Sequence, residues 1–181
     1  IGYLYVTGQE ADSLAANLQF GKVQPLYQNQ QYKLAITGDP AQQIPGLTEI
    51  AEKYSNTATG QVAMLYLGNS YFYTGEFDKA IEVYNDASPG DELLSAAVIA
   101  GKAAAYEAKQ DYAEAADLYK KAAAAYDNDL LTSERSFYAG RAYALAGDME
   151  AAQEMLLKAK EAKNQKYHQQ ADRLLAQYSL N

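Results

Sequence analysis

The segment from Met64 to Tyr84 reads MLYLGNSYFYTGEFDKAIEVY, and its pattern returns twice later in the chain. Counting from Tyr71, a large apolar residue follows at +6, alanine at +9, tyrosine or leucine at +13 and alanine at +16. The same series starts at Tyr106 and at Tyr143, so these anchor tyrosines lie 35 and 37 residues apart. The matching residues are Phe77, Ala80, Tyr84 and Ala87, then Tyr112, Ala115, Tyr119 and Ala122, and finally Met149, Ala152, Leu156 and Ala159. A period of this length in three copies predicts an array of helical repeats.

A small residue stands three positions before each anchor, namely Gly68, Ala103 and Gly140. We expect it, with the alanine at +9, to lie where the two antiparallel helices of one hairpin touch, because nothing larger fits there. Gly75 and Gly147 stand where the first helix must end, and Asp111 and Asp148 are placed to cap the second. One hairpin leaves an apolar side uncovered, so each is expected to be stable only when stacked on its neighbours.

These residues resemble the signature of the tetratricopeptide-repeat (TPR) family over residues 61–166. The resemblance implies an all-α fold, a right-handed α-solenoid of stacked helix-turn-helix repeats at about 61–94, 96–129 and 133–166. The chain departs from the family pattern at Lys102, which replaces the usual leucine, and at Ser136, which replaces a large aromatic residue. The proline that usually ends a repeat is also missing from all three copies. These departures weaken single packing contacts and leave the expected fold unchanged.

The N-terminal flank, residues 8–60, is expected to hold an atypical first repeat. A long helix from about 9 to 30 would use Leu14, Leu18, Val23 and Leu26 to pair with a second helix over residues 46–54. In that second helix Gly46 takes the small position and Ile50 follows four residues later. Residues 38–45 are rich in turn-forming residues and predict an insertion between the two helices.

At the other end, residues 167–181 predict a capping helix that shields the last repeat. Its expected apolar face consists of Ala171, Leu174, Leu175 and Tyr178.

Residues 1–7, which read IGYLYVT, are apolar and carry two tyrosines. Six or seven residues cannot span a bilayer, which needs about twenty, but they could be the end of a truncated transmembrane anchor, with tyrosines at the interface. The alternative is a short apolar segment that packs on the first helix.

The apolar start, the Gly-Asp insertion over residues 38–45 and the repeats together carry a more specific resemblance. In this combination the chain is similar to the membrane-anchored, YfgM-like TPR proteins of bacterial envelopes. That resemblance implies an inner-membrane anchor and a soluble domain facing the periplasm, with a cytoplasmic location as the alternative.

In the TPR family, the first helices of the hairpins line a concave groove that binds proteins or peptides, and this resemblance assigns ten candidate residues here. They are Leu65, Tyr66, Asn69, Phe72 and Tyr73 in the first repeat, Ala104 and Glu107 in the second, and Phe137, Tyr138 and Arg141 in the third. An alanine floor with aromatic walls at both ends could admit a helix or an extended peptide. The alternative is that several of these aromatic residues pack against adjacent helices, or against the N-terminal helix folded into the groove.

Some TPR domains resemble one another in a clamp of lysine and asparagine that holds a C-terminal carboxylate. Asn69 matches one position of that clamp, but Gly101 and Ala104 stand where another asparagine is needed. Arg141 is the one cation among the expected groove residues. We therefore expect no carboxylate clamp.

The formal net charge of −8 is unevenly distributed: residues 61–129 carry 12 acidic and 5 basic residues, whereas residues 130–181 carry 6 and 7. An acidic body argues against nucleic-acid binding, which needs clustered lysine and arginine. The chain has no cysteine and one histidine, His168, so the composition indicates neither a catalytic triad nor a histidine-rich metal site. We expect no enzyme activity, cofactor or metal.

The sequence therefore predicts a non-catalytic scaffold for protein–protein interaction that binds secretory, chaperone or assembly partners through the groove. Two alternatives remain open: a structural subunit of a larger membrane protein complex, using exposed second helices, and a cytoplasmic TPR adaptor. The sequence leaves the oligomeric state and the identity of the partner open.

Overall fold

The computed structural model describes residues 2–161 and 164–180, and the side chains of residues 2–7 are outside this description. Within these residues the protein is all-helical, with ten α-helices and one two-stranded ladder of two residues per strand. The chain divides into two compact units, Ile1–Gly90 and Asp91–Asn181. Each unit is described by itself.

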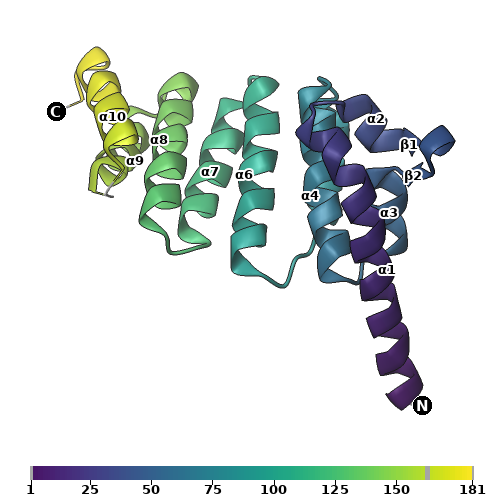
Figure 1. The fold of residues 1–181 in the computed structure, drawn as a ribbon. Helices are drawn as coiled ribbons and strands as arrows, with labels where there is room; N and C mark the ends of the chain where they lie inside the picture. The colour runs from purple at the N-terminus through teal and green to yellow at the C-terminus, as the bar shows by residue number, and fades with distance from the viewer. Residues whose placement is uncertain (1, 162–163, 181) are drawn as a thin grey trace. The chain divides into compact units, whose positions relative to one another are not determined.

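The N-terminal unit contains five helices (Figure 1). In chain order its elements are α1 (Gly2–Gln28), α2 (Tyr32–Thr37), β1 (Gly38–Asp39), the 3-10 turn η1 (Pro40–Gln42), β2 (Ile44–Pro45), α3 (Leu47–Lys53), α4 (Ala58–Tyr73) and α5 (Phe77–Asp86). Neighbouring helices pack against one another, and α1 and α2 also pack on α4. The core of the unit is built from buried side chains of α1 to α4, with Val23, Leu47 and Ile50 among the most deeply buried.

The expected long helix over residues 9–30 is present but shorter at its C-terminal end. Val23 and Leu26 are buried as expected, whereas Leu14 and Leu18 are 62% and 64% exposed, so the expectation that they pack is wrong. α1 ends at Gln28, because Gln30 adopts a left-handed conformation with φ of 60° and turns the chain into α2. The short helix α2 was not predicted. The expected insertion is an ordered turn, in which Gly38 pairs with Pro45 and Asp39 with Ile44. The Asp39 carboxylate accepts hydrogen bonds from the backbone of the following 3-10 turn.

The C-terminal unit also contains five helices, which follow one another in chain order (Figure 1). They are α6 (Glu92–Ala108), α7 (Tyr112–Ala124), α8 (Asp129–Ala146), α9 (Met149–Glu161) and α10 (Gln165–Gln177). Each packs against the next, and α10 also contacts α8. Tyr167, Ala171 and Leu175 of α10 are buried against Leu156 and Phe137, so the expected C-terminal helix covers the end of its unit.

The predicted hairpins are present as α4–α5, α6–α7 and α8–α9, and their first helices begin three or four residues before the expected repeat starts. The alanines at +9 are fully buried in all three hairpins, and the tyrosine or leucine at +13 is buried as well. Gly75 and Gly147 end α4 and α8 with φ of 81° and 90°, a conformation that glycine adopts without strain. In the second hairpin Gln110 takes this position with φ of 65°.

The expected capping aspartates differ from each other. The Asp148 carboxylate accepts a hydrogen bond from the Ala151 backbone N–H at 3.0 Å, as predicted. Asp111 makes no such side-chain bond at the start of α7, so that part of the prediction is wrong. Its φ of −84° and ψ of 72° depart from the extended conformation usual at a helix N-cap.

Close packing at the small position was predicted and is found in both units. A Cβ added to Gly68 would lie 2.4 Å from the ring of Tyr84, and one added to Gly140 would lie 2.7 Å from Cγ of Leu156. Both distances are shorter than real Cβ contacts allow, so only glycine fits without displacing a neighbour. Tyr84 and Leu156 occupy the same place in the repeat, which means that the two hairpins use the same contact.

Residues 2–7, considered above as the possible end of a membrane anchor, form the first turns of α1, while Ile1 lies outside the described residues. Over the described part of the chain, no helix combines the length and the hydropathy needed to cross a bilayer.

Candidate functional site

The ten candidate groove residues fall into two groups, one in each unit. Leu65, Tyr66, Asn69, Phe72 and Tyr73 lie on α4, whereas Ala104 and Glu107 lie on α6 and Phe137, Tyr138 and Arg141 on α8. The structure brings the residues of each group together within their own unit. The two groups are therefore described separately.

Tyr66 of α4 is covered by the N-terminal helix. The ring of Phe20 on α1 meets the Tyr66 ring edge-on with centroids 5.1 Å apart, and the Tyr27 ring lies 4.4 Å from it. A hydrogen bond between Thr59 of α4 and Asn17 of α1 joins the same two helices on the N-terminal side of these aromatic contacts. Tyr66 therefore follows the alternative stated above, in which aromatic residues of the expected groove pack against the N-terminal helix.

Asn69 is occupied by contacts inside its own unit. The Tyr84 hydroxyl donates to Oδ1 of Asn69 at 2.6 Å, and the Asn69 side chain is also hydrogen-bonded to Tyr27. Burial raises the pKa of Tyr27 to about 12, although the bond from Asn69 acts in the opposite direction. Asn69 thus links α1, α4 and α5 and fixes the side chains of both tyrosines.

Tyr73, at the end of α4, remains open to solvent with 57% of its surface exposed. Its ring stacks on Tyr32 of α2, with centroids 4.6 Å apart and planes 20° from parallel. The Phe72 ring turns toward Phe77 of α5 at 5.6 Å, and Leu65 is half-buried. Of the α4 group, Tyr73 is therefore the side chain most available to a partner.

In the C-terminal unit, Glu107 and Arg141 form an ion pair between α6 and α8. Their Oε1 and Nη2 atoms are 2.6 Å apart, and the Glu107 side chain is only 17% exposed. The Tyr119 hydroxyl of α7 donates to the other Glu107 oxygen at 3.1 Å, while the Arg141 guanidinium lies 4.9 Å from the Tyr138 ring centroid. Burial and the Glu107 carboxylate both raise the pKa of Tyr119. Arg141, the cation of the expected groove, is therefore neutralised by Glu107, which was also expected in the groove.

Phe137 and Tyr138 pack toward the C-terminal helix. Phe137 is buried, at 6% exposure, and its ring lies 5.6 Å from Tyr167 of α10. Tyr138 is half-buried and lies 5.9 Å from the same ring. The Tyr167 hydroxyl donates to Glu134 at 2.6 Å, and its pKa is raised by burial and by that bond. Consequently Tyr138 and Arg141 present surface to solvent, and Phe137 serves the core.

The Glu107–Arg141 pair and the contribution of Phe20 and Tyr27 were not predicted from the sequence. The pair had a usable signal, because opposite charges occupied two predicted groove positions on successive first helices. No signal in the sequence indicated the contacts of Phe20 and Tyr27, since no periodic pattern relates α1 to α4.

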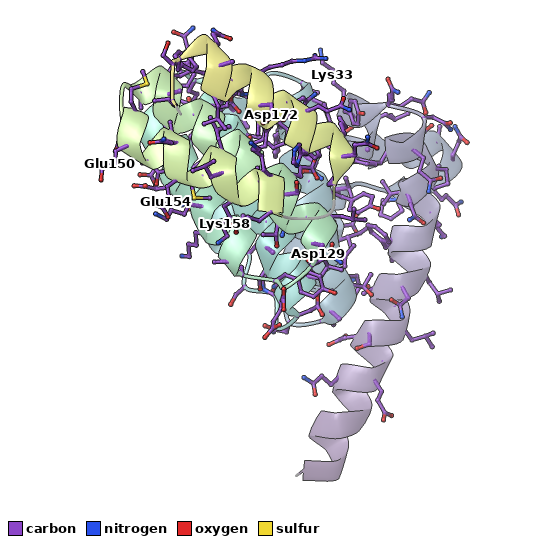
Figure 2. All side chains as sticks on the ribbon, turned by 90° about the vertical axis from the view of Figure 1, so that its left-hand side faces the viewer. Lys33, Asp129, Glu150, Glu154, Lys158 and Asp172 are labelled. Carbon is purple, nitrogen blue, oxygen red and sulfur yellow. The ribbon has the colours of Figure 1, made fainter. Side chains whose placement is uncertain are left out.

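The single histidine sits in a small polar cluster between α9 and α10. His168 Nδ1 lies 3.1 Å from the Lys160 backbone oxygen, and Asp172, labelled in Figure 2, pairs with Lys160 at 2.6 Å. Hydrogen bonding from Lys160 lowers the pKa of the Asp172 carboxyl. Over residues 2–161 and 164–180, no three histidine or acidic side chains converge in a way that could hold a metal ion.

A comparison of the chain with models of known protein families and with curated proteins found no match.

Proposed function

We propose that this protein is a non-catalytic scaffold of the TPR type that holds other proteins. The observation that carries the proposal is the repeated hairpin contact, in which Gly68 meets Tyr84 and Gly140 meets Leu156 at the same repeat positions. Serial hairpins built on one contact create extended surfaces from side chains of successive helices, and such surfaces typically bind peptides and protein segments.

The face formed by α6 and α8 is the better candidate for partner binding than the face of α4. On α4 the central ring, Tyr66, already has two aromatic partners from α1. On α6 and α8, Ala104, Tyr138 and Arg141 are half-buried, as Tyr66 is, but the aromatic contacts of Tyr138 come from α7, α8 and α10, within the run of helices that follow one another in this unit. Leu145 extends this face along α8 and is 46% exposed.

The chemistry of this face favours an apolar or aromatic partner segment over an acidic one. Because Glu107 neutralises Arg141 at 2.6 Å, a carboxylate on the partner would have to displace an existing anion. An apolar side chain can instead pack on Tyr138 and Ala104 without breaking the pair. A segment with a bulky apolar anchor is therefore the expected guest.

The proposal includes a place in the bacterial envelope, with the helical units outside the cytoplasm and held at the inner membrane. It rests on the likeness of the chain to membrane-anchored TPR proteins described above. Fractionation of cells that produce the protein from its own gene would test it. Recovery in the cytosolic fraction would contradict the location and leave the scaffold proposal standing.

Site-specific photo-crosslinking in living cells tests the binding face. A photoreactive residue at Leu145, on the α8 face, should capture partner proteins, whereas one at Leu157 of α9 should not. Leu157 is a matched control, since it is 44% exposed on the same unit. Adding Tyr138→Ala should reduce capture at position 145 by about tenfold, as loss of an aromatic anchor costs roughly 1–2 kcal/mol or more. Equal capture at both positions would rule out this face.

A further inference from the structure

A cavity of about 300 Å³ opens on the N-terminal unit between α3, α4 and α5. Its apolar lining consists of Ala51, Met64, Leu67, Tyr71 and Val83. Leu67 and Ala51 are buried, while Met64, Tyr71 and Val83 are half-buried, so the floor is accessible. The volume is at the lower end of the range of ligand pockets, about 300–1,000 Å³, and suits one or two side chains.

The rim of this cavity is acidic. Glu52 projects from α3, Glu82 and Asp86 project from α5, and all three side chains are exposed. Lys79 is the basic residue of the rim, and its ammonium already lies 2.6 Å from the Glu76 carboxylate. The rim therefore presents three carboxylates and no uncompensated cation.

The corresponding surface of the C-terminal unit carries an ion pair over a buried methionine. Aligned on the anchor tyrosines, Glu154 and Met155 of α9 take the places of Glu82 and Val83. Met155 is fully buried, and Lys120 of α7 lies 3.5 Å from Glu154 across that surface. Figure 2 shows Glu154 on the outer side of α9, near Glu150 and Lys158.

The difference between the units follows from two residues of α3. When Gly46 is aligned with Ala115, Ala51 stands at the position of Lys120 and Glu52 at that of Lys121. The N-terminal unit thus lacks the lysine that reaches across the C-terminal surface and has a carboxylate at the next position. Like charges on opposite walls repel each other, so a cation from outside would stabilise this arrangement.

We propose that this cavity, named the acidic groove from here on, binds a cationic amphipathic segment of a partner protein. Its apolar lining includes Met64, Leu67 and Val83, and its rim carries Glu52, Glu82 and Asp86. A bulky apolar side chain of that segment enters between α3 and α5, and its flanking lysine or arginine residues pair with the rim carboxylates. This site lies in a different unit from the α6–α8 face, so either proposal can fail while the other stands.

The test uses the full chain and a synthetic helical peptide with leucine on one face and lysine on the other. Two control peptides carry glutamate in place of lysine, or serine in place of leucine. Binding is measured by fluorescence anisotropy at physiological salt, and the binding site is mapped by NMR. We expect the leucine–lysine peptide to bind with shifts centred on Met64, Leu67 and Val83, and both controls to bind at least about tenfold more weakly.

The matched variants separate a specific site from general attraction to an acidic protein. Glu52→Lys with Glu82→Lys should weaken binding about tenfold or more, whereas Glu114→Lys with Glu150→Lys changes the net charge equally and should have little effect. All four side chains are exposed, so folding should be retained and is checked by circular dichroism. Val83→Ser tests the floor and should also weaken binding.

Three results would overturn the proposal. The first is that both charge-reversed pairs of substitutions weaken peptide binding equally, and the second is that the peptide shifts NMR signals outside the acidic groove. The third is that the wild type binds no peptide but self-associates, and that Glu52→Lys abolishes this self-association. The last result would identify a second copy of the chain as the occupant.

Discussion

The hairpins α4–α5 and α8–α9 share one contact and differ in what surrounds it. Glycine meets the residue at +13 in both, but this residue is Tyr84 in the first and Leu156 in the second. Tyr84 extends a hydroxyl to Asn69, which also bonds to Tyr27 of α1, so the first hairpin is tied to a helix outside the repeat pattern. Leu156 has no such group; in the second hairpin Met155 is fully buried and Glu154 pairs with Lys120 of α7.

The repeat pattern thus specifies how two helices approach each other and leaves the outer surfaces free to vary. The same interior contact is found beside an open cavity with an acidic rim in one unit and beside the Lys120–Glu154 ion pair in the other. The variable positions are therefore the ones in which binding specificity is expected to reside.

The largest effect is expected from alkali, which acts on both units at once. Burial raises the pKa of Tyr27 to about 12, and the pKa values of Tyr84, Tyr119, Tyr143 and Tyr167 are raised as well. Because the folded-state pKa lies above the unfolded value of about 10, the stability contributed by these tyrosines is complete below that pH. It is lost as pH rises through the folded-state values.

Phenolate absorbance during an alkaline titration, followed together with circular dichroism, checks this expectation. Tyr27 has an amide donor that favours its ionisation, whereas Tyr119, Tyr143 and Tyr167 face carboxylates that oppose it. We therefore expect Tyr27 to ionise before the other three, as a difference titration with Tyr27→Phe would show. Ionisation of all tyrosines near pH 10 with the fold intact would contradict the buried geometry.

The next largest effect is expected at the shared glycine contact. Gly68→Ala and Gly140→Ala should each lower the free energy of unfolding by about 1–3 kcal/mol, because the new methyl group overlaps a packed neighbour. Gly140→Ala should cost more, since the backbone nitrogen of Leu156 also lies 3.0 Å from the added atom and cannot retreat like a side chain.

Urea unfolding monitored for both units would measure these changes. Gly21→Ala in α1 is the control, since nothing lies within 4 Å of its added Cβ. Alanine there should be neutral or stabilising by up to about 1 kcal/mol. Wild-type stability of Gly140→Ala would show that the two helices are not in close contact.

A smaller effect is expected at the hydroxyl of the third anchor tyrosine. Tyr143 donates a hydrogen bond to Oδ1 of Asp117 on α7, and Tyr143→Phe should cost about 1 kcal/mol, because Asp117 is exposed and can be hydrated instead. Tyr71→Phe is the matched control on α4. Its hydroxyl forms no hydrogen bond within the described residues, so little change is expected. Equal losses in thermal unfolding would contradict the assigned role of Asp117.

The smallest effect is expected at the exposed ion pair between Lys120 of α7 and Glu154 of α9. Lys120→Ala removes the partner of Glu154 and should cost about 0.2–1 kcal/mol at low salt, and less at high salt. Lys121→Ala makes the same charge change one residue away. A salt-independent loss at Lys120 would indicate that its side chain contributes packing and not charge.

The elements that could be predicted from the sequence are those governed by local pattern. The hairpins, the glycines that end α4 and α8, and the close contacts of Gly68 and Gly140 all depend on spacings within about twenty residues of one another. The acidic groove was not predicted. Its character depends on Ala51 and Glu52 of α3 relative to α5, and their importance appears only beside Lys120 and Lys121 of the C-terminal unit.

The contacts of the candidate residues were not predicted, for a similar reason. Glu107 and Arg141 were both predicted as groove positions, but the pairing of their side chains depends on the distance between α6 and α8. Tyr66 was predicted as a groove wall, with packing against the N-terminal helix as the alternative, and it is packed by Phe20 of that helix. The residues of α1 that would make this contact could not be named, because no repeat pattern relates α1 to α4.

The packing of α1 on α4 has a consequence for biosynthesis. The bond between Asn17 and Thr59 spans 42 residues, so α1 leaves the ribosome well before the helix that covers its aromatic side chains. At a synthesis rate of about 5–20 residues per second, the delay amounts to a few seconds. During that interval the partners of Phe20 and Tyr27 on α4 have not yet been synthesised, so these two rings cannot make their native contacts with Tyr66.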